Sequence, residues 1–101
     1  MTGKLLPPES ALKIVWDQRK ARSNLRKHKV SFKEGESVFD DPLSITKPDP
    51  DHSVNENRFL TLGISFRHRL ILVAHTDDPD EIRIISARLP TQSERDAYEN
   101  D

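Results

Sequence analysis

The stretch "RFLTLGISFRHRLILVAHTDDPDEIRIISARL" at residues 58–89 has the pattern of three consecutive β-strands. It contains three runs rich in apolar and β-branched residues, which begin at Arg58, Arg69 and Glu81 and are typical of strands. The turns between them, "FRH" and "DDPD", are short enough to force antiparallel neighbours. The run "LILVA" is apolar on both faces, which predicts a central, covered strand.

Two helices are predicted before this stretch. Asp17 is a suitable N-cap for a helix that runs without a breaker to Lys29. Ser31 and Glu34 have the spacing of a capping box for a second helix, which "DDP" at 40–42 ends. The first helix has a narrow apolar stripe, which consists of Ala21, Leu25 and His28.

Shorter segments complete the predicted fold. We expect strands at "KIVW" (13–16) and "LSIT" (43–46), and a C-terminal helix opened by Thr91 and Glu94. This order predicts an α+β fold, in which two N-terminal helices pack on one face of a small antiparallel sheet and a short C-terminal helix follows. Residues 1–12 are expected to be a flexible tail and residues 13–101 a single domain.

Composition excludes several classes of protein. The 101 residues include no cysteine, which excludes disulfides and thiolate metal sites. No apolar run approaches the roughly 18 residues that a membrane span needs, and no signal peptide is recognisable. We therefore expect a soluble, cytoplasmic protein that does not bind membranes.

Charge is strongly segregated, although the formal net charge is only -1. Residues 13–33 carry eight Lys or Arg and one Asp, whereas residues 34–57 carry seven Asp or Glu and one Lys. A basic face of this kind is typical of a polyanion-binding protein, and the alternative is a solvated helix surface. The candidate RNA-binding residues are Arg19, Lys20, Arg22, Arg26, Arg67 and Arg69.

Three arginines in the predicted sheet are candidates for binding one anion: Arg58, Arg83 and Arg88. Cross-strand ion pairs with nearby carboxylates are the alternative. His28 and His75 have suitable chemistry for acid–base catalysis, although His75 also suits a near-core position and His28 a helix C-terminus. A hard-cation site is an alternative for five residues near each other in sequence, but their spacing matches no metal-ligand motif, so no metal or cofactor is expected: Asp40, Asp41, Asp49, Asp51 and His52.

The blocks "WDQRKARSNLRKHKVSFKEGESVFDDP", "RFLTLGIS", "LILVAHT" and "RIISARLPTQSERDAYE" resemble the BrnT family of bacterial type II toxins. The resemblance covers residues 14–99 and implies a fold similar to RelE-type toxins. It also implies a stress-response endoribonuclease that cleaves RNA without a metal and inhibits translation. A BrnA-like antitoxin would silence it, in a complex that binds operator DNA.

The resemblance also implies roles for single residues. Arg58, Arg83 and Arg88 would clamp the reacting phosphate. Lys27 or His28 would act as the acid–base group, with His75 as a further candidate. Trp16, Asp17, Phe32 and Phe39 are assigned to structure. Lys29 departs from the family, which usually has glycine there to end the helix in a left-handed conformation.

Two other functions are compatible with the same basic face. One is a nucleic-acid-binding module without catalysis, and the other is an inactive toxin that serves only in a repressor complex. RNA cleavage by the purified chain distinguishes the toxin from both.

Overall fold

The computed structural model describes residues 13–51 and 57–100, so the predicted tail and part of the acidic loop lie outside the described residues. The elements in chain order are β1 (Lys13–Val15), α2 (Gln18–His28), α3 (Phe32–Ser37), the 3-10 helix η1 (Val38–Asp40), β2 (Ile45–Pro48), β3 (Arg58–Ile64), β4 (Leu70–Thr76), β5 (Glu81–Arg88) and α4 (Gln92–Glu99). None of the helices in these ranges has the length and apolar character required to cross a bilayer.

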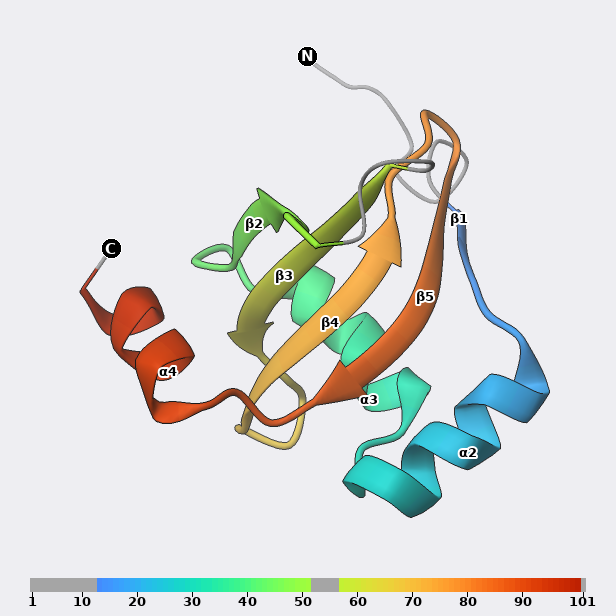
Figure 1. Ribbon diagram of the computed structural model, residues 1–101, viewed down its shortest axis with the longest axis horizontal. Helices are drawn as coiled ribbons and strands as arrows, with labels where there is room; N and C mark the ends of the chain where they lie inside the picture. The colour runs from blue at the N-terminus through green and yellow to red at the C-terminus, as the bar shows by residue number, and fades with distance from the viewer. Residues whose placement is uncertain (1–12, 52–56, 101) are drawn as a thin grey trace, which may run out of the picture.

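The five strands form one sheet in the order β1-β5-β4-β3-β2 (Figure 1). The run "LILVA" lies in the central strand β4, as predicted, and β2, β3, β4 and β5 are antiparallel neighbours. β1 differs from the prediction because it pairs with β5 in parallel. Parallel neighbours need a long connection, and most of the chain separates these two strands. Local sequence patterns therefore do not reveal this pairing.

The two faces of the sheet are covered differently. On one face, α3 and the segments around it bury Phe32 and Val38 against the strand residues Ile71, Val73 and Ile84. The helix lies close to the sheet, since a Cβ added at Gly35 would be 3.2 Å from the Cβ of Ala87. The opposite face has a smaller apolar cluster, Leu62, Leu70 and Leu72, against which Tyr98 of α4 packs. The rest of that face is where the cavities described below open.

Helix α2 is held to the sheet by a buried amide rather than by its apolar stripe. The Asn24 side chain donates to the carbonyl oxygens of Val30 (2.9 Å) and Ala87 (2.8 Å) and accepts from the Ala87 N–H (3.2 Å). Ala21 packs against the core as predicted, but Leu25 is 49% exposed. The predicted stripe is therefore wrong at Leu25, because the hydrogen bonds of Asn24 set the rotation of the helix.

Two local predictions differ in detail. The second strand begins at Ile45 instead of residue 43, because Asp41 holds a turn by accepting the N–H groups of Leu43 and Ser44. The Ser31 hydroxyl accepts the Glu34 N–H as predicted (2.9 Å). However, the Glu34 carboxylate does not complete a capping box, because it binds the side chains of Ser65 and Arg69.

Lys29 ends α2 in the left-handed conformation, with φ 60° and ψ 29°. A non-glycine residue is strained there, so Lys29→Gly is expected to raise the free energy of unfolding by about 1 kcal/mol. Urea unfolding of the two proteins measures this difference. A less stable glycine variant would show that contacts of the Lys29 side chain stabilise the fold by more than its left-handed backbone conformation destabilises it.

Candidate active site

A small polar cavity brings together side chains from three elements. It has a volume of about 180 Å³ and lies between the N-terminal end of α2 and the strands β3 and β5. Its lining residues are Asp17, Lys20, Arg58, Arg83, Ile84 and Ile85. Three of these side chains are cationic and one is a carboxylate, so the cavity is a suitable site for an anion.

The strand register explains why the two arginines line one cavity. Arg58 on β3 lies opposite Thr76 on β4, and the Thr76 hydroxyl accepts the N–H of Arg83 on β5 (3.1 Å). The two arginines therefore lie on strands that flank the same residue, about 10 Å apart across two strand spacings. Guanidinium groups on long side chains can reach one anion across this distance.

The start of α2 provides the other two polar groups. Asp17 caps the helix, because its Oδ1 accepts the N–H groups of Arg19 (2.8 Å) and Lys20 (3.1 Å). The Lys20 N–H bond is the largest of the influences that lower the pKa of Asp17, so this carboxyl is ionised at neutral pH. Lys20 follows one helical turn later and lines the same cavity.

A larger cavity of about 410 Å³ adjoins the first, and Arg58 lines both. It also contains Ser86, Arg88 and Glu94. Arg88 and Glu94 form a bidentate pair, with N–O distances of 2.9 and 3.0 Å. Hydrogen bonding to Arg88 lowers the pKa of Glu94. Arg88 is thus near the other two sheet arginines, but Glu94 compensates its charge.

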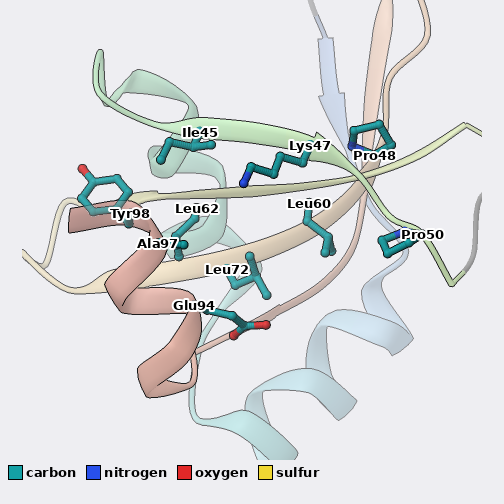
Figure 2. A pocket seen from close by; sticks show the side chains of 10 residues that line it. All are labelled: Ile45, Lys47, Pro48, Pro50, Leu60, Leu62, Leu72, Glu94, Ala97 and Tyr98. Carbon is teal, nitrogen blue, oxygen red and sulfur yellow. The ribbon is translucent and has the colours of Figure 1, made fainter. Parts of the chain in front are cut away.

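A third cavity, of about 280 Å³, adjoins the second one and lies between β2 and α4 (Figure 2). It shares Pro50, Leu60, Leu72 and Glu94 with the second cavity. The three cavities share lining residues and so form one groove across the face of the sheet that α4 partly covers; we call it the sheet groove. Its Lys20–Arg58–Arg83 end is basic, and its β2–α4 end is mainly apolar.

Lys27 and His28 do not line the sheet groove. Both lie in the last turn of α2, roughly 11 Å along the helix axis from Lys20. The exposed residues Arg19, Arg22 and Arg26 lie on the same helix. The helix therefore presents a basic surface that extends away from the cavity lined by Arg58 and Arg83.

His75 lies in the core, where it is only 2% exposed. The carbonyl oxygen of Thr76 accepts from its Nδ1 (2.8 Å), so Nε2 accepts from the Thr61 hydroxyl (2.7 Å). Its ring contacts Phe39 edge-to-face, with ring centroids 4.9 Å apart. Burial lowers the pKa of His75, which keeps the ring neutral at pH 7. This environment is that of a structural histidine.

Arg67 and Arg69 lie beyond the far end of β3 from Arg58, a separation of roughly 20 Å along the strand. The Arg69 Nε donates to the buried carboxylate of Glu34 (2.9 Å), and the Arg67 guanidinium is 3.9 Å from it. The Ser65 hydroxyl donates to the same carboxylate (2.6 Å). Arg69 therefore balances a buried charge, and both side chains lie away from the sheet groove.

Carboxylates and histidines do not cluster as metal ligands in residues 13–51 and 57–100. Asp41, one of the acidic residues considered for a cation, accepts from Ile64 N–H (2.8 Å) and the Tyr98 hydroxyl (2.9 Å). The hydrogen bond from Ile64 is the main cause of its lowered pKa. His52 lies outside the described residues.

Sequence reasoning missed two features of the groove. Asp17 was assigned only a capping role, although its D-x-x-K spacing with Lys20 places both side chains at the first turn of one helix. Glu94 was assigned only to a capping box, which it does form, with Thr91 N–H 2.8 Å from its Oε1. No sequence signal indicated that Glu94 also pairs with Arg88.

Comparison with known proteins identifies the family. The family model described as "Ribonuclease toxin, BrnT, of type II toxin-antitoxin system" matches residues 16–94. The crystal structure of the Brucella abortus ribonuclease toxin BrnT has a similar fold, with a TM-score of 0.62 and 23% sequence identity over 80% of this chain and 99% of that chain. No curated protein matches in sequence. This chain therefore belongs to the BrnT family of ribonuclease toxins of type II toxin–antitoxin systems.

Proposed function

We propose that this toxin cleaves RNA in the cavity formed by Lys20, Arg58 and Arg83. The observation that carries the proposal is that three cationic side chains, from α2, β3 and β5, line one small cavity. In the transition state of phosphodiester cleavage, negative charge builds up on the phosphoryl oxygens, and fixed cations stabilise that charge. Arg58 and Arg83 are suitably placed to clamp these oxygens.

The reaction needs a nucleophile that RNA itself provides. The ribose 2′-oxygen attacks the adjacent phosphorus and loses its proton, while the bond from phosphorus to the 5′-oxygen breaks and that oxygen gains a proton. The products are a 2′,3′-cyclic phosphate and a 5′-hydroxyl. In our proposal the ionised Asp17 accepts the first proton and Lys20 donates the second. Positioned acid–base groups of this kind contribute about 10²–10⁴-fold.

The exposed basic residues of α2 would bind the RNA on either side of the cleaved bond. Arg19, Arg22 and Arg26 lie on the helix whose first turn lines the cavity, and Lys27 and His28 continue it. Phosphate contacts of this type add affinity without sequence preference. We therefore assign Lys27 and His28 to binding in this proposal instead of to proton transfer.

Lys20 and Arg22 are a suitable pair for testing this division. Lys20→Gln is expected to lower the single-turnover cleavage rate at saturating protein by about 10²-fold, because it removes the proton donor. Arg22→Gln should leave that rate unchanged but weaken binding and reduce its salt dependence by about one charge. The assay contains excess EDTA, since the proposed steps use only protein groups. Equal effects of the two changes, or loss of wild-type cleavage in EDTA, would contradict the proposal.

We also propose that a BrnA-like antitoxin inhibits this toxin by covering the sheet groove, and that the resulting complex binds operator DNA. A type II system pairs its toxin with a protein antitoxin, and acidic side chains would complement the basic end of the groove. Co-purification of the chain with the product of its neighbouring gene should give a stable complex without ribonuclease activity. Separate migration of the two proteins at micromolar concentration would contradict this assignment.

A further inference from the structure

The apolar end of the sheet groove lies apart from the cavity that we propose as the phosphate site. Figure 2 shows Leu60, Leu62 and Leu72 along the sheet, with Ala97 and Tyr98 of α4 on one side. Among the described residues, the ionisable ones that line it are Lys47, Glu94 and Tyr98. Glu94 is engaged by Arg88, and Tyr98 donates its hydroxyl to Asp41 (2.9 Å). A cavity of this composition suits a flat, mostly apolar group.

We propose that this end of the groove binds a nucleobase of the RNA whose phosphate occupies the Lys20–Arg58–Arg83 cavity. The inference rests on the proposed function and adds a base-binding subsite to it. Unpaired bases insert readily among apolar and aromatic side chains, because every base has an apolar face.

The distance between the two subsites fits a single strand. Leu60 lies two residues after Arg58 on β3, so the two side chains share a face of the sheet and their backbones are about 7 Å apart. The second cavity shares Arg58 with the basic end and Leu60 with the apolar end, so it lies between the two. One RNA strand can therefore place a phosphate at Arg58 and a nearby base over Leu60.

The charge pattern of the groove determines which part of the RNA faces which subsite. The middle cavity is lined by the carboxylates of Asp49, Asp51 and Glu94 as well as by Arg58 and Arg88. The three carboxylates outnumber the two guanidinium groups here, and Arg88 is engaged by Glu94, which disfavours a second phosphate in this section. The backbone of the bound strand is therefore expected to lie along α2, and the base to point across the sheet toward α4.

Ala97 allows the subsite to be filled without removing a core side chain. It lies on α4, is exposed and lines the apolar cavity, so Ala97→Leu inserts a larger side chain there. Ser93→Leu is the matched control, because Ser93 is exposed on the same helix and is not among the residues lining the groove. Thermal unfolding verifies that both variants are folded.

Binding is measured by fluorescence anisotropy with two probes. One is a short mixed-sequence RNA with 2′-fluoro groups, which cannot be cleaved, and the other is the same backbone with abasic sites. Ala97→Leu is expected to weaken binding of the first probe roughly tenfold and to leave the abasic probe unchanged. Ser93→Leu should change neither.

Other outcomes overturn the base subsite. Wild-type affinity of Ala97→Leu for the base-containing probe, or an equal loss for both probes, would show that no base occupies the cavity. Unchanged RNA binding with loss of the antitoxin complex would instead assign the cavity to a side chain of the antitoxin. Cleavage of unmodified RNA by Arg58→Ala tests the phosphate site separately: a wild-type cleavage rate would contradict the proposed function, whatever Ala97→Leu does.

Discussion

Arg58→Ala and Arg83→Ala are each expected to lower RNA cleavage at saturation by two orders of magnitude or more. This corresponds to a loss of about 2.7 kcal/mol of transition-state stabilisation. The two arginines line the same cavity from strands that flank Thr76, so each is placed to stabilise charge on one phosphate. RNA affinity should fall far less, because α2 presents several other cations to the backbone. Single-turnover kinetics and anisotropy measure the two effects separately.

Arg67→Ala is the matched control for these variants. Arg67 is 59% exposed beside Glu34, beyond the opposite end of β3 from Arg58, so its removal should leave the cleavage rate unchanged. Circular dichroism must first show that each variant is folded, since arginines in a sheet also stabilise it. If folded Arg58→Ala and Arg83→Ala variants cleave RNA at the wild-type rate, the catalytic groups must instead be among Lys27, His28 and Arg88.

Asn24→Ala is expected to lower the free energy of unfolding by about 3 kcal/mol. The side chain amide satisfies the carbonyl groups of Val30 and Ala87 and the N–H of Ala87, all in a buried environment. A buried polar group that loses its partner costs about 1–3 kcal/mol, and this substitution leaves three such groups without their partner. Urea unfolding monitored by circular dichroism gives the difference.

Ser23→Ala is the control, because Ser23 is exposed on the same helix and precedes Asn24. It should change the free energy of unfolding by less than about 0.5 kcal/mol. A similarly small change for Asn24→Ala would show that water replaces the amide, and that α2 is held to β5 by other contacts. In that case the position of Lys20 beside the arginines would need another explanation.

The sequence predicted elements better than their connections. The run "LILVA" identified the central strand because a strand apolar on both faces must be covered on both. Asp17 and Thr91 identified helix starts because their side chains can satisfy free backbone N–H groups. The parallel pairing of β1 and β5 depends on contacts between segments far apart in the chain, which no local pattern encodes.

The candidate site was only partly predictable for the same reason. Arg58 and Arg83 were recognisable as sheet residues near strand ends, and they do line one cavity. Lys20 was grouped with the rest of the basic helix, because sequence does not show that the first turn of α2 lines the sheet groove while its last turn does not. Lys27 and His28 lie away from the groove because hydrogen bonds from Asn24 fix the position of α2. One of these bonds links Asn24 to Ala87, 63 positions later in the chain.

A structure of the toxin with a short RNA, made uncleavable by 2′-O-methyl groups, would locate the phosphate site. We predict a phosphate in contact with the side chains of Lys20, Arg58 and Arg83. Phosphates at Lys27 and His28, with none in the cavity lined by Arg58 and Arg83, would contradict this assignment of the active site.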